Sequence, residues 1–233
     1  MKSIVILTGA GISAESGLKT FRDSGGLWEG RSVEEVATIE AFGKDPETVN
    51  RFYNARRRQL SEVTPNRAHL ALARLGEHLG DSLTLITQNV DDLHERGGSK
   101  NVLHMHGQLL RKKCVWCGVE SDCQEDLSLT DVCPNCQRDG GMRPDIVWFG
   151  EIPKYLNEID SALRSASLFV SIGTSGHVYP AAGFVEMARL SGTPTLELNA
   201  ESTQKSNLFD ETRTGMATQI VPAFVEEILK ACR

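Results

Sequence analysis

The sequence predicts an α/β fold: a doubly wound parallel sheet with a small cysteine-bearing domain inserted into it. Short apolar runs, of the kind that form strands buried on both faces, alternate along the chain with stretches of helical periodicity. Five of the six cysteines fall within residues 111–145, where the composition changes. The alternation indicates the sheet, and the cysteines indicate the insert.

Composition narrows the class of protein. The chain has 233 residues, enough for one sizeable core or for a core and a small module. Its net charge of −6 argues against non-specific nucleic-acid binding and is compatible with a basic partner. No stretch approaches the ~20 apolar residues of a membrane span, and the first strand starts too early to leave room for a signal peptide. We therefore expect a cytoplasmic monomer without direct nucleic-acid or membrane partners.

The first strand leads directly into a glycine-rich turn. Ile4–Leu7 is a continuous apolar run, and the next segment, Gly9–Ala14, fits the pattern G-x-G-x-x-A. Glycines let backbone N–H groups approach a pyrophosphate, with the positive end of a helix facing the anion. An ordinary strand–turn–helix corner can carry the same pattern, but the position after a strand favours a nucleotide site. The long loop Glu15–Gly30 that follows indicates a functional role.

Two helices are expected next. We expect one over 41–62, because Asp45 is a good N-cap and Pro46 suits the first helical position. Thr64-Pro65 begins the second helix in the same way, and Gly80 ends it. The apolar residues of the second helix share one face; they are Ala68, Ala71, Leu72, Leu75 and Leu79.

Later strands end in small or amide residues. Buried strands are expected at 83–87, 168–172 and 194–198, a further strand at 146–149, and helices at 153–166, 180–190 and 222–230. The carboxyl ends of parallel strands lie along one edge, where ligands bind. Any one strand end fits an ordinary turn, but four sets on one edge favour a nucleotide cleft. These sets are Gly9–Gly11, Gln88–Asn89, Gly173–Ser175 and Asn199–Ala200.

Four cysteines have the spacing of a zinc site. Cys114 and Cys117 are separated by two residues, as are Cys133 and Cys136. Each pair places two thiolates on one tight turn, and two such turns complete a tetrahedron around Zn²⁺. Four cysteine ligands leave no open position, so we expect one structural zinc ion. A redox-active pair fits less well, because neither pair opens a helix after a strand. We expect the two remaining cysteines to be small buried or partly buried hydrophobes.

His106 is the candidate general base. It lies between the strand end at Gln88–Asp91 and the cysteine-bearing segment, where a wall of the cleft must run. Imidazole titrates near neutral pH and so suits the removal of a proton from a sugar hydroxyl. A short extended piece is expected over 102–107, and His104 lies on the same side of it as His106, so the two rings could pair, or one could face the cleft. We interpret His69, His78 and His94 as surface or core residues.

A tyrosine and an arginine are candidate ligands for a carboxylate. Tyr53 and Arg56 are three residues apart on a predicted helix and so share one face. A phenol beside a guanidinium makes a fork for a carboxylate. The sequence leaves open whether this face meets the cleft.

Together these motifs resemble those of the sirtuins, the NAD-dependent protein-lysine deacylases, over essentially the whole chain. The resemblance rests on the zinc cysteines, on the pair His106-Gly107, and on the segments GAGIS (9–13), TFRDSGGLW (20–28), TQNVDDLH (87–94), VWFGE (147–151), GTSGHVYPAAGF (173–184) and LNAE (198–201). It implies a Rossmann-like NAD-binding domain formed by 1–30, 80–110 and 144–233. Residues 31–79 would be the helical part of the small domain, and 111–143 its zinc-binding module.

The resemblance also assigns residues to the site. His106 would be catalytic, and Phe21 and Arg22 would shield the ribose and order the cofactor loop. The implied NAD-binding residues are Gly9, Ala10, Gly11, Ser13, Phe21, Arg22, Trp28, Gln88, Asn89, Val90, Asp91, Gly173, Thr174, Ser175, Asn199, Ala200, Glu201 and Ala217. An acylated-lysine peptide would add as a strand between 147–151 and 176–179. The implied substrate residues are Tyr53, Arg56, Val147, Phe149, Gly150, Glu151 and Val178.

Within the family, Tyr53 and Arg56 look like the Y-x-x-R pair of the bacterial class III members. That pair binds the carboxylate of succinyl-, malonyl- or glutaryl-lysine, and Ala37 would keep the acyl pocket roomy. Ile39 stands where the family pattern has a proline, so the loop 36–42 is expected to differ in shape. The implied reaction removes acetyl, and succinyl or other dicarboxylic acyl groups, from protein lysines. Its products are nicotinamide, O-acyl-ADP-ribose and free lysine.

Two interpretations from other classes remain open at this point. An NAD-dependent dehydrogenase with a structural zinc would need a ribose-binding acid after a second strand, about 20 residues beyond the turn, and none is found there. A zinc-knuckle module for nucleic acid would need a basic surface, which the net charge of −6 disfavours.

Overall fold

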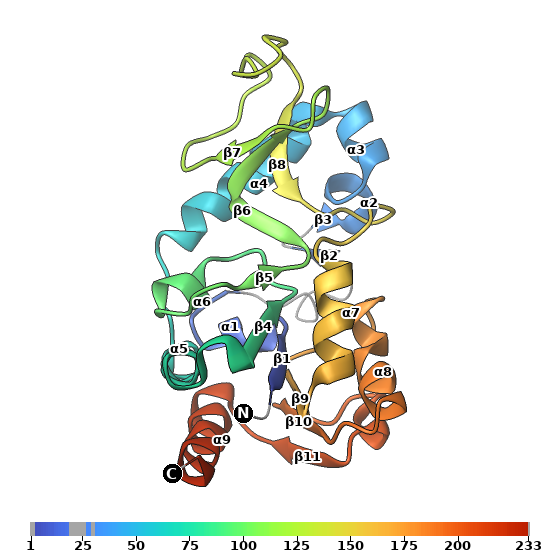
Figure 1. Ribbon diagram of the computed structural model, residues 1–233. Helices are drawn as coiled ribbons and strands as arrows, with labels where there is room; N and C mark the ends of the chain where they lie inside the picture. Colours follow the sequence, from blue (N-terminus) through green and yellow to red (C-terminus); the bar gives the residue numbers. More distant parts are fainter. Residues whose placement is uncertain (1–2, 19–26, 29–30, 233) are drawn as a thin grey trace.

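A computed structural model describes residues 3–18, 27–28 and 31–232, of which 27–28 are described by their backbone alone. The chain folds into two lobes (Figure 1). The larger lobe holds a six-stranded parallel sheet, and the smaller lobe holds a three-stranded antiparallel sheet. In spatial order the large sheet consists of β11 (Glu211–Thr214), β10 (Thr195–Asn199), β9 (Leu168–Ile172), β1 (Ile4–Thr8), β4 (Leu83–Thr87) and β5 (Leu103–His104). The predicted fold class is confirmed.

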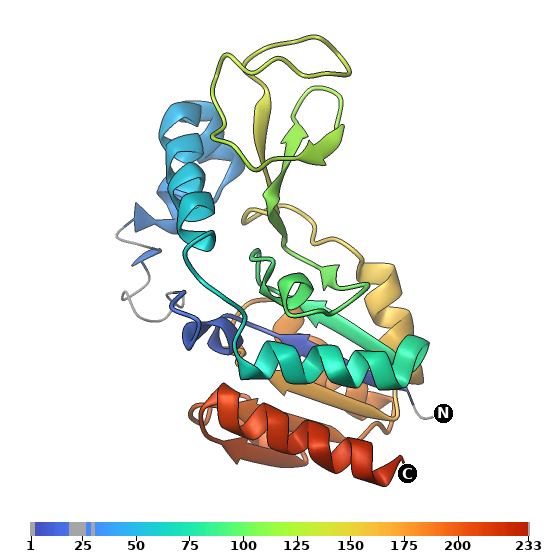
Figure 2. The same ribbon diagram turned by 90° about the vertical axis from the view of Figure 1, so that its left-hand side faces the viewer.

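The strand β1 lies inside the large sheet and sets its register. Ile4 is opposite Leu83 of β4 and Leu168 of β9, so the carboxyl ends of the three strands are level. Helices cover both faces of the sheet (Figure 2). The helices α5 (Arg67–Leu79) and α9 (Ala217–Ala231) pack together over one face, and α7 (Leu156–Ser165) and α8 (Phe184–Leu190) cover the other.

Alternate residues of β1 serve the two faces. Ile4 and Ile6 belong to the core beneath α5 and α9, whereas Val5 and Leu7 belong to the core beneath α7 and α8. This is the period-two alternation of a strand, and both faces are apolar because both are covered.

The smaller lobe combines a β-sheet with helices that precede it in the chain. Its sheet consists of β6 (Gly107–Cys114), flanked by β7 (Glu120–Asp122) and β8 (Met142–Ile146). The helices α2 (Val33–Val36), α3 (Ile39–Lys44) and α4 (Pro46–Leu60) pack beside it. The shorter elements are α1 (Gly11–Ala14), α6 (Leu93–Arg96), the hairpin of β2 (Leu27–Trp28) with β3 (Arg31–Ser32), and the 3₁₀ turns Gly80–Ser82, Ala181–Gly183 and Ser206–Leu208.

Several predicted helix boundaries were wrong. The single helix expected over 41–62 is two helices, because Asp45 ends α3 and its side chain caps α4. The helix expected to begin at Thr64-Pro65 begins at Arg67, where the Asn66 side chain accepts a hydrogen bond from the backbone of Ala68. The helix expected from 222 begins at Ala217, so Pro222 lies inside it.

The other differences concern strands and short turns. The strand expected at 146–149 is β8, which ends at Ile146, and only Phe149 forms a further bridge, to Thr38. The helices expected at 153–166 and 180–190 begin later, at Leu156 and Phe184. The edge strand β5 lies within the short extended piece expected over 102–107, whereas the polar edge strand β11 was not expected. In the described part of the chain no helix is long and apolar enough to cross a membrane.

Two glycine turns lie against each other at the carboxyl edge of the large sheet. The backbone N–H of Gly11 donates to the carbonyl of Gly173 at 2.9 Å, and that of Gly9 donates to Ile172 at 2.9 Å. A Cβ atom on Gly11 would lie 2.7 Å from the Cα of Gly173, which has a φ of +61°. These glycines are therefore required for the close approach of two backbones, and a side chain at either position would separate the strand ends.

We expect Gly11→Ala to lower the free energy of unfolding by about 1–3 kcal/mol, the usual cost of overpacking. Gly43→Ala is the matched control, because a Cβ at this position in α3 meets nothing within 4 Å. Calorimetry should show a lower Tm for the first variant and an unchanged or higher Tm for the second. Equal Tm values for the two variants would contradict this account of the turn.

Candidate functional site

A cavity of about 620 Å³ opens at the carboxyl edge of the large sheet, between the two lobes. All four predicted strand ends contribute to its wall, and so do α4 and the segment after β8. The predicted residues that line it are Gly9, Ala10, Gly11, Ser13, Tyr53, Arg56, Gln88, Asn89, Val90, Asp91, His106, Val147, Phe149, Gly150, Glu151, Gly173, Thr174, Ser175, Val178, Asn199, Ala200, Glu201 and Ala217.

Two predicted residues lie outside the described part of the chain, and the side chain of a third is not described. Phe21 and Arg22 are among the residues the structure does not describe, and Trp28 is described by its backbone alone. The helix that follows the glycine turn is a single turn, Gly11–Ala14. The dipole of this single turn is therefore smaller than the dipole of the full-length helix that follows a typical dinucleotide-binding turn.

A buried polar network forms the floor of the cavity. The Ser13 hydroxyl donates to Asp91 Oδ2 at 3.1 Å and accepts from Asn89 Nδ2 at 3.2 Å. The backbone N–H of Leu93 donates to the other Asp91 oxygen at 3.1 Å. Burial raises the pKa of the Asp91 carboxyl to about 6, and these hydrogen bonds oppose the rise. The floor is thus held in one arrangement, with amide and carboxylate groups at the cavity wall.

His69 supports this floor from α5. The backbone N–H of Asn66 donates to His69 Nδ1, so the ring proton lies on Nε2, 3.4 Å from Ser13 Oγ. Burial lowers the pKa of His69 to about 4, which keeps the ring neutral. His94 lies 5.0 Å from His69 between ring centres and contacts Thr8 Oγ1 at 3.0 Å. Both histidines are buried. Of the two alternatives left open for His69, surface or core, the structure shows the second: His69 is a core residue with polar partners.

The other end of the cavity is lined by the ends of β9 and β10. Asn199 is buried, and its Nδ2 donates to the carbonyl of Thr174 at 2.7 Å, which joins the two strand ends. Glu15 accepts a hydrogen bond from the backbone N–H of Thr218 at 3.0 Å, at the start of α9. A carboxylate there satisfies an N–H group that the helix itself leaves unpaired.

His106, but not His104, faces the cavity. His104 is buried and contacts Glu95 at 2.7 Å through Nε2. His106 Nδ1 lies 3.2 Å from the carbonyl oxygen of Gln88. A carbonyl oxygen can only accept, so Nδ1 carries the proton and Nε2 carries the lone pair of a base. Burial lowers the pKa of His106, and the hydrogen bond to Gln88 acts in the opposite direction.

The face of α4 that bears Tyr53 and Arg56 lines the cavity. Tyr53 is completely buried, and burial raises the pKa of its phenol above the usual range, so the hydroxyl keeps its proton. Its oxygen accepts a hydrogen bond from Trp148 Nε1 at 2.9 Å. Ala37 also lines this part of the cavity, and Ile39, the departure from the family pattern, is exposed at the first residue of α3. A phenol, a guanidinium and a small side chain are therefore among the groups that line the cavity.

The three consecutive arginines of α4 have three different environments. Arg56 lines the cavity, and Arg58 is exposed and paired with Asp126. Arg57 is buried and donates to the carbonyls of Leu109 and Glu125, both at 3.1 Å. The charged run is therefore not one solvated face: its first member belongs to the cavity and its second holds α4 to the cysteine-bearing segment.

The four predicted zinc ligands converge. The sulfur atoms of Cys114, Cys117, Cys133 and Cys136 all lie within 4.8 Å of one another, with 3.8 Å between Cys114 and Cys136. A tetrahedral zinc with bonds of about 2.3 Å places its sulfurs about 3.8 Å apart, so the residues fit the metal. Four cysteine ligands leave no open position on the metal, so a zinc ion held here would be structural. Of the other cysteines, Cys123 is buried as expected, whereas Cys232 is exposed, so that prediction was wrong for Cys232.

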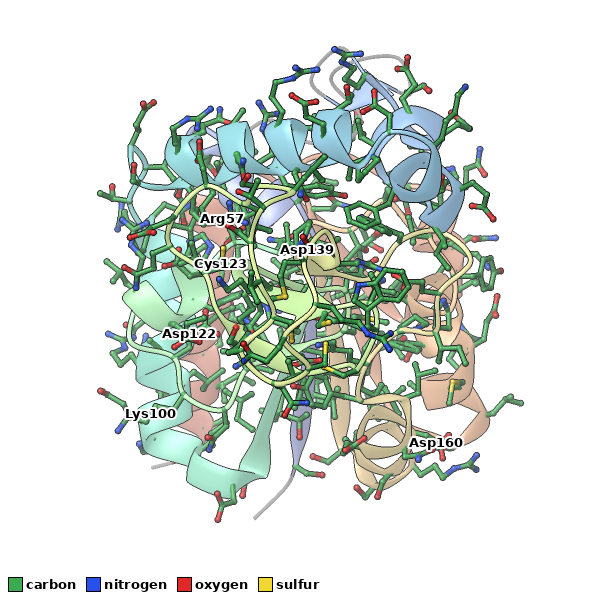
Figure 3. All side chains as sticks on the ribbon, turned by 90° about the horizontal axis from the view of Figure 1, so that it is seen from above. Arg57, Lys100, Asp122, Cys123, Asp139 and Asp160 are labelled. Carbon is green, nitrogen blue, oxygen red and sulfur yellow. The ribbon has the colours of Figure 1, made fainter. Side chains whose placement is uncertain are left out.

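The zinc module is attached to α4 through Cys123 and the residues after it. Seen from above, Arg57 and Cys123 lie next to each other, on α4 and the module respectively (Figure 3). Asn54 donates to the carbonyl of Leu127 at 2.9 Å and accepts from its N–H at 2.9 Å. A two-way amide pair of this kind fixes both partners relative to each other, so it holds the module against the cavity-lining helix.

Sequence reasoning missed two buried residues beside the cavity, Arg143 and Trp148. Arg143 lies inside a strand and Trp148 within an apolar run, and neither has a partner nearby in the sequence that indicates a role. Arg143 donates twice to Glu151, and its guanidinium carbon lies 3.4 Å from the centre of the Trp148 indole. Once the structure shows that Arg143 is buried inside a strand, a partner is required for its charge, and Glu151 supplies it.

The comparisons with known proteins agree with one another. The model of the Sir2 family matches residues 9–180. A protein named NAD-dependent protein deacylase from Yersinia pseudotuberculosis is 55% identical over 231 residues, and one of the same name from Escherichia coli K12 is 55% identical over 232 residues. The matches cover 98% and 99% of this chain, and 83% of each relative. A solved Sir2 homologue–NAD complex is 38% identical with a TM-score of 0.90, covering 100% of this chain and 91% of that one. A Sir2 bound to acetylated peptide is 30% identical with a TM-score of 0.82, covering 97% and 92%.

We expect Cys133→Ala to abolish stoichiometric zinc binding, because three thiolates leave the tetrahedron incomplete. Cys123→Ala is the matched control, since Cys123 is a buried cysteine of the same module outside the cluster. Metal analysis of the purified proteins should give one zinc per chain for the wild type and for Cys123→Ala, and well below one for Cys133→Ala. Full zinc content in Cys133→Ala would refute the assigned ligand set.

Proposed function

The chain belongs to the Sir2 family, and we propose that it removes succinyl and related dicarboxylic acyl groups, as well as acetyl, from protein lysines. It is an NAD-dependent protein deacylase, as its relatives are named. The proposed products are nicotinamide, O-acyl-ADP-ribose and free lysine. The dehydrogenase and zinc-knuckle interpretations are set aside, because the family and the four-cysteine site account for both the nucleotide turn and the metal.

The observation that carries the acyl preference is the pairing of Tyr53 and Arg56 at one end of the cavity. The pair offers a neutral donor and a cation, which together match a carboxylate. A succinyl group differs from an acetyl group by such a carboxylate at its far end. The acetyl group leaves the pair unused, so the pair discriminates between the two substrates.

The sheet side of the cavity supports NAD binding. Gly9, Gly11 and Gly173 carry no side chains, so a nucleotide can approach the backbone of their turns directly. Asn89 and Asp91 place polar groups at the floor of the cavity. When bound, NAD supplies the electrophilic ribose carbon and becomes the acceptor of the acyl group. We assign the ends of β9 and β10 to the adenosine half, with the nicotinamide half near Asp91.

His106 is assigned the role of general base. Its Nε2 lone pair is available because Nδ1 donates to Gln88. It would take a proton from a ribose hydroxyl and so make that oxygen a nucleophile toward the acyl carbon. The half-exposed segment after β8, with Phe149 and Gly150, would pair with the backbone of the peptide, opposite Val178.

The first test replaces the cation of the acyl pocket. We expect Arg56→Met to lower kcat/KM for a succinyl-lysine peptide by ~10- to 100-fold, since a charge-assisted hydrogen bond contributes ~1.5–3 kcal/mol. The same variant should change kcat/KM for the matched acetyl peptide by less than about 3-fold. Arg58→Met is the control, because Arg58 belongs to the same run but is paired with Asp126 at the surface. Equal losses for both peptides in Arg56→Met would refute the assignment.

The second test is the pH profile with the acetyl peptide. A base must be neutral to act, and burial lowers the pKa of His106, so its neutral form persists to lower pH than in free imidazole. We therefore expect kcat/KM to fall as pH falls, with its midpoint below the ~6.5 of an unperturbed histidine. His106→Tyr should lose peptide-dependent turnover. A midpoint at or above 6.5, in enzyme shown to stay folded across the range, would contradict the account.

A further inference from the structure

The indole of Trp148 fixes the direction of one hydrogen bond at Tyr53. Trp148 Nε1 and the Tyr53 oxygen are 2.9 Å apart, and both side chains are almost completely buried. An indole N–H can only donate, so the phenol oxygen is the acceptor in this contact. The phenolic proton must then point away from Trp148. Since Tyr53 lines the cavity, Trp148 sets the orientation in which the phenol can donate into it.

Trp148 is itself held on several sides. The guanidinium carbon of Arg143 lies 3.4 Å from the indole centre, and the ring of Phe42 lies 5.4 Å from it. Arg143 donates to both oxygens of Glu151 at 2.8 Å, and the backbone N–H of Trp148 donates to Glu151 Oε2 at 2.8 Å. Both carboxylate oxygens of Glu151 are thus engaged with Arg143 and Trp148. Glu151 therefore holds both the Arg143 guanidinium and the backbone of Trp148 in place.

We propose that Trp148 is a positioning residue for acyl specificity: its N–H holds the Tyr53 oxygen, so that the phenolic proton is presented to the carboxylate of a dicarboxylic acyl group. This inference rests on the proposed function, because it concerns the same acyl pocket. A donor to the phenol oxygen also polarises the O–H bond and makes the phenol a better donor. The Arg143–Glu151 pair holds the indole in place, and so it affects acyl specificity indirectly, through Trp148.

The test removes the indole N–H and reads out both acyl groups. Trp148→Phe should lower kcat/KM for the succinyl peptide by about 3- to 10-fold, the fold-change that corresponds to one neutral hydrogen bond. The loss should be in KM, and acetyl turnover should change less than about 2-fold. Trp116→Phe is the matched control, because Trp116 is 57% exposed on the zinc module and should change neither substrate.

A double-mutant cycle shows whether Trp148 acts through Tyr53. In a Tyr53→Phe background, Trp148→Phe should bring no further loss with the succinyl peptide, because the hydroxyl that it orients is gone. A loss of the same size in both backgrounds, or equal losses on succinyl and acetyl peptides, would overturn the inference. If Tyr53→Phe alone leaves the ratio of succinyl to acetyl activity unchanged, it is the proposed function that fails.

A subtler replacement covers the case in which Trp148→Phe does not fold. Incorporation of β-(3-benzothienyl)alanine at position 148 replaces the N–H group with sulfur and keeps the two fused rings. The expected result is the same selective loss with the succinyl peptide at unchanged Tm. Full succinyl activity with this residue would overturn the inference, because the shape of the ring, and not its N–H, would then be sufficient.

Discussion

Two turns from distant parts of the chain touch backbone to backbone at Gly11 and Gly173, and the geometry of the cavity depends on this contact. It holds the ends of β1 and β9 together, so that the backbone itself forms the wall where a nucleotide can lie. A Cβ atom at either position would force the two turns apart and so disrupt this wall of the cavity. The polar floor of the cavity, which includes Ser13 and Asp91, lies beside this contact. Ser13 is only two residues from Gly11, so the contact also fixes the position of the floor.

The second constraint is α4, which faces two ways. One face brings Tyr53 and Arg56 to the cavity, while Asn54 and Arg57 bind the backbone of the zinc module. The four-cysteine cluster lies outside the cavity, but it belongs to the module that holds this helix in place. The same logic applies to Trp148, whose position depends on the buried pair of Arg143 and Glu151. The positions of these cavity-lining residues therefore depend on contacts outside the cavity.

The predictability of each element follows from how local its cause is. The apolar strands and the cysteine pairs were predicted because their signals lie in consecutive residues. Asp45 and Pro46 were recognised as the start of a helix, but the division of the segment 41–62 was missed because Asp45 also ends the separate short helix α3. The edge strand β11 is polar and forms only against β10. The roles of Trp148 and His69 come from partners distant in sequence, which no local pattern records.

The most direct test of the central claim is mass spectrometry of the products formed from NAD and a succinyl-lysine peptide. The account predicts free lysine peptide, nicotinamide and O-succinyl-ADP-ribose in equal amounts, with no reaction when NAD is left out. Free lysine peptide formed together with succinate while NAD remains intact would contradict it, because the acyl group would then have been hydrolysed without the nucleotide.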